Sequence, residues 1–112
     1  EDSKFGYPVY DLPAREKFFS EVEHLASLSN LSIKGLMTMP PLFDDPEMTR
    51  PYFRALRELR DILVKNFPSL NLHELSMGTS SDFQAAVEEG ATIVRVGTAL
   101  FGPRPKPVEA AE

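Results

Sequence analysis

The sequence contains no cysteine, and this absence excludes disulfide bonds and thiolate metal sites. It also lacks an excess of positive charge, because 17 acidic residues against 12 lysines and arginines give a net charge of −5. A nucleic-acid partner needs a basic face to neutralise phosphates, so this balance argues against DNA or RNA binding. No apolar run approaches the roughly 20 residues that cross a bilayer, and no signal-peptide pattern opens the chain. We therefore expect a cytoplasmic protein with no membrane partner and no nucleic-acid partner.

Patterns for nucleophilic or metal chemistry are missing as well. No ordering of Ser, His and Asp supports a nucleophilic triad, so we assign no catalytic residues. His24 and His73 lack the spacing of metal ligands, and surface or cap positions are the better interpretation of both. The acidic pairs at 44–45 and 88–89 are interpreted as solvated ends of a loop and a helix.

The 112 residues, 42% of them hydrophobic, suffice for one globular unit and are too few for two cores. Ten prolines are many for this length, and several stand near the ends of the expected elements. Within the closing stretch PRPKPVEAAE we predict a disordered tail at 105–112. Residues 1–104 therefore form the expected folded unit.

Helical periodicity is clear in two long segments. Apolar residues recur at helical spacing from Ala14 to about residue 28, and Asp11 or Pro13 can open that helix. A second helix carries Pro51 in its first turn, where the missing N–H costs nothing, and extends to about Asn66.

Two shorter helices are expected further along the chain. One begins near Ser81, whose partner at Gln84 has capping-box spacing, and ends before Gly90. Its predicted buried stripe consists of Phe83, Ala86 and Val87. The segment GTALFG then leaves room for about one helical turn before a proline stops it.

Three apolar segments between the helices predict strands at 31–39, 71–77 and 92–96. Because strands alternate with helices, they should pair in parallel through right-handed crossovers. The expected fold is therefore α/β, with three parallel strands and flanking helices. A sheet of three parallel strands has open edges, so this architecture looks like part of a larger fold.

The second and third strands end in similar turns, SMGTSS and VGT. Each turn places a glycine and hydroxyls between the end of a strand and the start of a helix, where backbone N–H groups point outward and anions settle. One such turn alone is more often a plain helix cap. Two of them in this order, the second opening a very short helix, match the phosphate site after strands 7 and 8 of a (β/α)8 barrel.

Arg95 lies inside the apolar strand TIVRV, and a charged side chain in that position needs a partner. One interpretation is an arginine in a barrel interior that faces a ligand. The other is an ion pair with Glu74 or Asp82, and periodicity alone leaves both open.

The segment LSMGTSSDFQAAVEEGATIVRVGTALFGPRP resembles the C-terminal signature of the pyridoxal phosphate homeostasis protein family, whose barrel is shared with the N-terminal domain of alanine racemase. The stretches EDSKFG, RPYFRALREL and IKGLMTMPP agree with the same family, and the resemblance covers almost the whole chain apart from the tail. It implies that residues 1–104 are the C-terminal half of a (β/α)8 TIM-type barrel. It also implies binding of pyridoxal 5′-phosphate (PLP) for intracellular PLP homeostasis, with no established catalysis.

The same resemblance implies a set of cofactor-binding residues. Carried over by position, they are Ser76, Met77, Ser80, Arg95, Gly97 and Thr98. The two serines, with Gly97 and Thr98, would surround the phosphate. Arg95 would face the pyridine ring, and Met77 would line the pocket wall. Thr79 stands where the family usually has methionine, and its hydroxyl can add a phosphate donor or face solvent.

The Schiff-base lysine of the family lies on the first strand of the barrel, and nothing in this chain matches that segment. The lysines present, which all match other contexts, are Lys4, Lys17, Lys34, Lys65 and Lys106. A complete barrel takes about 250 residues, so we expect a C-terminal fragment with the lysine upstream. Its partners would be PLP and the N-terminal half of the barrel, with self-association if the chain is truly truncated.

Two alternatives stay open at this point. A PLP-dependent racemase needs a second acid or base near the ring, usually Tyr or Cys, but Tyr7, Tyr10 and Tyr52 all lie away from the expected strand ends. A barrel that binds another phosphorylated metabolite, such as a sugar phosphate, would share only the anion loops.

Overall fold

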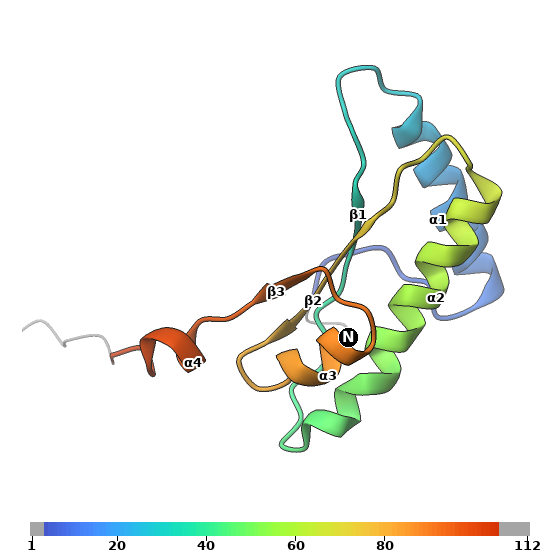
Figure 1. Ribbon diagram of the computed structural model, residues 1–112. Coiled ribbons are helices and arrows are strands. Elements are labelled where there is room, and N and C mark those ends of the chain that lie inside the picture. The colour runs from blue at the N-terminus through green and yellow to red at the C-terminus, as the bar shows by residue number, and fades with distance from the viewer. Residues whose placement is uncertain (1–3, 106–112) are drawn as a thin grey trace, which may run out of the picture.

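The computed structural model describes residues 4–105 (Figure 1). Its elements are α1 (Leu12–Ala26), β1 (Gly35–Met37), the 3-10 helix η1 (Pro46–Thr49), α2 (Arg50–Asn66), β2 (Glu74–Thr79), α3 (Phe83–Glu88), β3 (Ile93–Arg95) and α4 (Thr98–Phe101). This is the predicted order, with η1 added. The predicted tail lies outside the described residues, apart from residue 105.

The three strands form one parallel sheet in the order β1-β2-β3, which confirms the predicted α/β fold. Gly35 of β1 pairs with Glu74 of β2, and Ser76 of β2 pairs with Ile93 of β3. The register between β2 and β3 shifts before Thr79. Figure 1 shows α1 and α2 side by side, while β3 leads away from them toward α4.

Each strand is shorter than, or shifted from, its predicted range, because regular pairing covers only part of each apolar segment. The ladder of β1 is extended by single bonds on both sides, since the Glu74 N–H donates to Lys34 O at 2.9 Å and the Thr38 N–H to Ser76 O at 3.2 Å. The helices follow the prediction more closely. Asp11 opens α1 by accepting a hydrogen bond from the Ala14 N–H at 2.8 Å.

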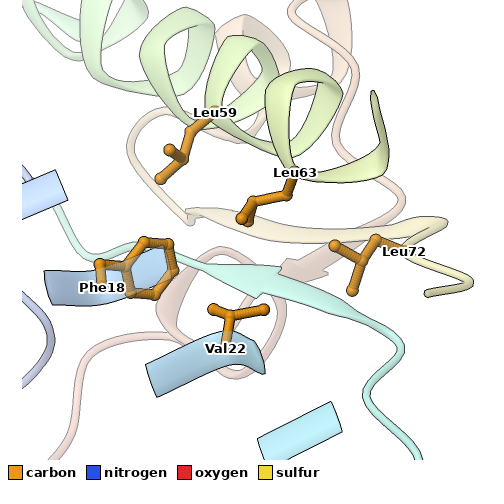
Figure 2. Close-up of a cluster of buried hydrophobic side chains, with 5 residues drawn as sticks. All are labelled: Phe18, Val22, Leu59, Leu63 and Leu72. Carbon is orange, nitrogen blue, oxygen red and sulfur yellow. The ribbon is translucent and has the colours of Figure 1, made fainter. Parts of the chain in front are cut away.

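The core consists of two clusters of buried side chains. One joins α1 and α2 and is made of Phe18, Val22, Leu59, Leu63 and Leu72 (Figure 2). The other lies between β2 and the helices α2 and α3, and is made of Phe53, Leu75, Met77, Ala85 and Ala86. The second cluster fixes the position of β2 against the helices, and with it the loop that follows β2.

The predicted buried stripe of α3 is wrong at two of its three positions. Ala85 and Ala86 are buried, whereas Phe83 is 40% and Val87 55% exposed. The reason is the close approach of α3 to β2, because a Cβ added at Gly78 would lie 2.6 Å from the Ala86 Cβ. At that distance only small residues fit between helix and strand.

The predicted capping box at the start of α3 is also wrong. The N-cap residue is Asp82, and no side-chain hydrogen bond caps the helix there. The Asp82 carboxylate is already occupied, since its Oδ1 accepts a hydrogen bond from the Thr79 N–H at 2.7 Å. The prediction that α3 ends before Gly90 is confirmed.

Glu89, interpreted from sequence as solvated, is only 6% exposed. It forms ion pairs with the arginines of α2: Arg54 Nη2 at 2.9 Å, Arg57 Nη1 at 3.0 Å and Arg50 Nη1 at 3.5 Å. The hydrogen bond from Arg54 holds the pKa of this carboxyl below its ordinary value, against the opposing effect of burial. Spacings of four and three residues put the three arginines on one face of α2. Their ion pairs with Glu89, the C-cap residue of α3, therefore hold the end of α3 against α2.

Among the described residues, no helix is long and apolar enough to cross a membrane. Within residues 4–105 there is likewise no group of three or more His, Cys, Asp or Glu side chains that could hold a metal ion.

Candidate functional site

Arg95 crosses the sheet at the carboxyl ends of the strands. Its Nη1 donates to Ser76 Oγ of β2 at 2.6 Å, and its Nη2 donates to the carbonyl oxygen of Thr38, one residue past β1, at 3.0 Å. One half-buried guanidinium therefore connects all three strands. Its planar fork reaches these two acceptors with two different nitrogens, a geometry that the single nitrogen of a lysine does not provide.

The ion pair of Arg95 with Glu74 or Asp82, one of the two interpretations left open by the sequence, does not form. Glu74 Oε2 accepts a hydrogen bond from Thr92 Oγ1 at 2.7 Å, and the carboxylate of Asp82 is turned toward Thr79. In the part of the chain that the structure describes, Arg95 contacts no carboxylate. Its charge is therefore available to a ligand on this edge of the sheet.

The two glycine-hydroxyl loops contact each other, as their order in the sequence predicts for a joint site. Ser80 Oγ, in the loop after β2, accepts hydrogen bonds from the N–H groups of Gly97 and Ala99, both at 3.0 Å. Thr98 lies between these two residues as the first residue of α4. Ser80, Gly97 and Thr98 are thus brought together by one side chain.

Gly97 faces open space. A Cβ added at this position would meet no atom within 4 Å, and the φ of −117° is accessible to any residue. Nothing in residues 4–105 therefore requires a glycine at position 97. The small residue leaves room beside the loops for a ligand to approach the backbone.

Thr79 is half-buried, and its hydroxyl is hydrogen-bonded within its own turn. The hydroxyl donates to Asp82 Oδ1 at 3.2 Å and lies 3.3 Å from Ser81 Oγ. Asp82 is 8% exposed and was not among the predicted site residues. The signal for it was the three-residue spacing from Thr79, which is typical of a side chain that closes a tight turn.

Met77 lies away from this group of residues. It has no exposed surface and packs with Phe53, Leu75 and Ala86 in the cluster beneath α2 and α3. Alternate residues of a strand face opposite sides, so Met77 and Leu75 share the helix side of β2 and Ser76 faces the other. The Met77 side chain is therefore part of the core and not of a pocket wall.

Two cavities adjoin the loops without enclosing Arg95 or Gly97. The larger, about 410 Å³, lies between α2 and α3, and Ser80 is the only predicted site residue in its wall. The smaller, about 200 Å³, is bounded by Thr79, Asp82 and Lys4, among others. Lys4 Nζ donates there to the carbonyl oxygens of Pro40 at 2.8 Å and Met39 at 3.0 Å. Arg95 and the open space at Gly97, and not the larger cavity, mark the candidate site.

The parallel strands and the paired loops are those of a barrel domain of the alanine racemase type, and the family model "Alanine racemase, N-terminal domain" matches residues 12–105. Within that class, the similar proteins point to one family. The chain belongs to the pyridoxal phosphate homeostasis protein family.

Two curated relatives and one solved structure show the extent of the similarity. The pyridoxal phosphate homeostasis protein of Aquifex aeolicus is 56% identical over 82 residues, which are 73% of this chain and 36% of the relative. That of Pseudomonas aeruginosa is 44% identical over 104 residues, 93% of this chain and 40% of the relative. The structure of PipY from Synechococcus elongatus PCC7942, with PLP bound, matches with a TM-score of 0.73 and 42% identity over 78% of this chain and 41% of PipY. The chain thus spans about two fifths of the length of these relatives.

Proposed function

We propose that this chain supplies the phosphate-binding loops of a PLP-binding barrel that serves PLP homeostasis and has no catalysis of its own. The observation that carries the proposal is the contact of Ser80 Oγ with the N–H groups of Gly97 and Ala99, because it joins the two loops that sequence order had paired. The structure of a relative with PLP bound supports the choice of ligand. A cytoplasmic location stays a prediction from the sequence.

At the phosphate end, the proposed ligands are Ser80, Gly97 and Thr98. Phosphate oxygens accept hydrogen bonds from backbone N–H groups and hydroxyls. Hydrogen bonds to an anion are stronger than those between neutral groups. The open space at Gly97 fits a phosphate that approaches the backbone closely. These residues therefore suit the phosphate of PLP.

At the ring end, the proposed residues are Arg95 and Ser76. The sequence resemblance placed Ser76 beside the phosphate, but its hydroxyl oxygen accepts a hydrogen bond from Arg95. We assign it instead to holding the guanidinium, together with the Thr38 carbonyl. Met77 is left out of the proposed site because its side chain is in the core.

When bound, PLP supplies an aldehyde that condenses with primary amines. We propose that the lysine which links the cofactor covalently lies in the part of the relatives that this chain does not cover. Of the described lysines, Lys34 is exposed just before β1, and Lys4 bonds to two backbone carbonyls. Lys106 lies outside the described residues.

Residues 1–104 are proposed to be the C-terminal part of the barrel, with the N-terminal half as their partner. Ile93 and Val94 of β3, at the edge of the sheet, are exposed, as is Phe101 of α4. Apolar surface of this kind is normally covered, and the remaining strands and helices of a barrel would cover it. Without them the same surface would drive the self-association predicted from the sequence.

The test is a titration of the full-length protein with PLP, followed by absorbance. Ser80→Ala and Gly97→Ala should each weaken PLP binding about tenfold or more. The first removes a hydroxyl that would bond to the charged phosphate, and the second places a methyl group where the phosphate would approach the backbone. Ser20→Ala, an exposed serine on α1, is the matched control and should leave the affinity unchanged. Unchanged PLP affinity in both loop variants would overturn the assignment of the phosphate site.

Two further measurements separate the rival functions. Ribose 5-phosphate should fail to displace PLP, and displacement at equal concentration would favour a general phosphate-binding barrel. Racemisation of alanine by the full-length protein would favour the enzyme.

Borohydride reduction of the PLP complex, followed by mass mapping, locates the covalent lysine. The modified residue should lie outside residues 1–112. A stoichiometric adduct on any lysine of this chain would contradict its proposed position.

A further inference from the structure

We propose that Asp82 is a positioning residue of the phosphate loop, which holds Ser80 in place by closing the turn from Thr79 to Asp82. The proposal rests on the proposed function, because it assigns a role within the same site. No hydrogen bond joins Asp82 to Gly97 or Ala99, and it acts through Thr79 and Ser80.

The turn is closed by three hydrogen bonds between its first and last residues. Asp82 Oδ1 accepts from the Thr79 N–H at 2.7 Å and from Thr79 Oγ1 at 3.2 Å. The Asp82 N–H in turn donates to the Thr79 carbonyl oxygen at 3.2 Å. A carboxylate that is only 8% exposed needs such donors, and here both come from one residue.

The closed turn leaves Ser80 and Ser81 as its tip. Ser80 Oγ then reaches the N–H groups of Gly97 and Ala99, both at 3.0 Å. Thr79 is also the register partner of Arg95 in the sheet. Asp82 therefore fixes the turn that carries Ser80 to the phosphate end of the site, whereas Arg95 at the ring end is held by Ser76 and Thr38.

The direction of the carboxylate matters as much as its contacts. A negative charge that faced a bound phosphate would repel it, with an energy that grows as the surroundings become less polar. Both donors to Asp82 Oδ1 come from Thr79, and no hydrogen bond joins this carboxylate to Gly97, Thr98 or Ala99. The tip of the turn, Ser80 and Ser81, carries no charge that would repel a bound phosphate.

This role and a purely electrostatic role make opposite predictions. If the carboxylate only repelled the ligand, Asp82→Asn would tighten PLP binding. If it positions Ser80, Asp82→Ala should weaken PLP binding about tenfold, as Ser80→Ala does, and Asp82→Asn should weaken it less, because one acceptor oxygen remains.

The experiment compares PLP with pyridoxal, which lacks the phosphate, in the full-length protein. Asp82→Ala should lower the affinity for PLP and leave that for pyridoxal unchanged. In a Ser80→Ala background, Asp82→Ala should have no further effect, because both changes remove the same hydroxyl from the site. Asp44→Ala, an exposed aspartate in the loop before η1, is the control and should change neither affinity.

A second readout needs no ligand. Amide hydrogen exchange at Gly97 and Ala99 should accelerate in Asp82→Ala to the rate seen in Ser80→Ala, and should stay unchanged in Asp44→Ala. If Asp82→Ala does not fold, Asp82→Asn gives the same comparison with a smaller change.

The outcomes separate the two proposals. Weaker PLP binding in Ser80→Ala without any change in the Asp82 variants would overturn the positioning role alone. An equal loss for PLP and pyridoxal, or additive losses in the double variant, would also overturn it, since Asp82 would then act on the fold as a whole. No effect of either Ser80→Ala or Gly97→Ala on PLP binding would instead overturn the proposed phosphate site.

Discussion

Replacing Gly78 with alanine should destabilise the protein more than any other glycine-to-alanine change near the candidate site. Gly78 has a φ of +102°, a conformation that side chains rarely adopt. Its added Cβ would lie 2.6 Å from the Ala86 Cβ and 3.2 Å from the Phe83 Cα. The strained backbone should cost about 1–3 kcal/mol and the overpacking about as much again. We therefore expect the free energy of unfolding to fall by about 2–6 kcal/mol.

Urea unfolding of the full-length protein, followed by circular dichroism, measures this change. Gly97→Ala is the matched control, because its Cβ would meet no atom of residues 4–105 within 4 Å and its φ is ordinary. It should change the free energy of unfolding by no more than about 0.5 kcal/mol. The double variant Gly78→Ala, Ala86→Gly removes the clash between the two methyl groups and keeps the backbone strain. A coupling energy of about 1–3 kcal/mol is expected from this cycle. A Gly78→Ala protein as stable as the Gly97→Ala control would refute the close packing of α3 on β2.

Three further predictions concern the ion-pair cluster, the core and the ring end. The hydrogen bonds from arginine lower the pKa of Glu89, so this residue adds stability above the ordinary pKa of glutamate, and that stability is lost as the pH falls through the lowered value. Glu89→Gln should therefore flatten the loss of stability between neutral and acid pH in urea unfolding, and an unchanged pH profile would contradict the cluster. Leu63→Ala, at a fully buried position, should cost about 2–5 kcal/mol, whereas Val64→Ala, at an exposed one, should cost about 0.5 kcal/mol or less; equal costs would contradict the packing of α1 on α2. Arg95→Lys should weaken PLP binding about tenfold in an absorbance titration, because lysine lacks the planar fork whose two nitrogens contact Ser76 and Thr38, and unchanged affinity would remove Arg95 from the site.

The order of the elements and the parallel sheet could be predicted because alternating patterns of apolar residues are local signals. The meeting of the two loops was also predictable, since the carboxyl ends of parallel strands lie on one edge of a sheet. Ser80 and Gly97 accordingly come together as expected.

The orientation of α3 was not predictable from its own residues. Hydrophobicity favoured burial of Phe83 and Val87, but the approach allowed by Gly78 admits only the smaller Ala85 and Ala86. Which residue lies opposite a glycine on another element depends on tertiary packing, which a single sequence does not encode locally.

The partners of charged residues were the other failure. Glu89 reads as a solvated helix end unless the arginines of α2, spaced to share one face, are considered with it. For Arg95 the sequence left open a ligand-facing position and an ion pair with Glu74 or Asp82, and in the structure it donates to a hydroxyl and a carbonyl oxygen. In both cases the partner depends on tertiary geometry, which periodicity does not give.

A crystal structure of the full-length protein with PLP would show whether the two loops hold the phosphate. We expect phosphate oxygens within about 3 Å of Ser80 Oγ and of the Gly97 N–H, which would then donate to the phosphate in place of Ser80, with the pyridine ring on the side of Arg95. A phosphate bound in the larger cavity beside Arg50, or at any place away from both loops, would contradict this expectation.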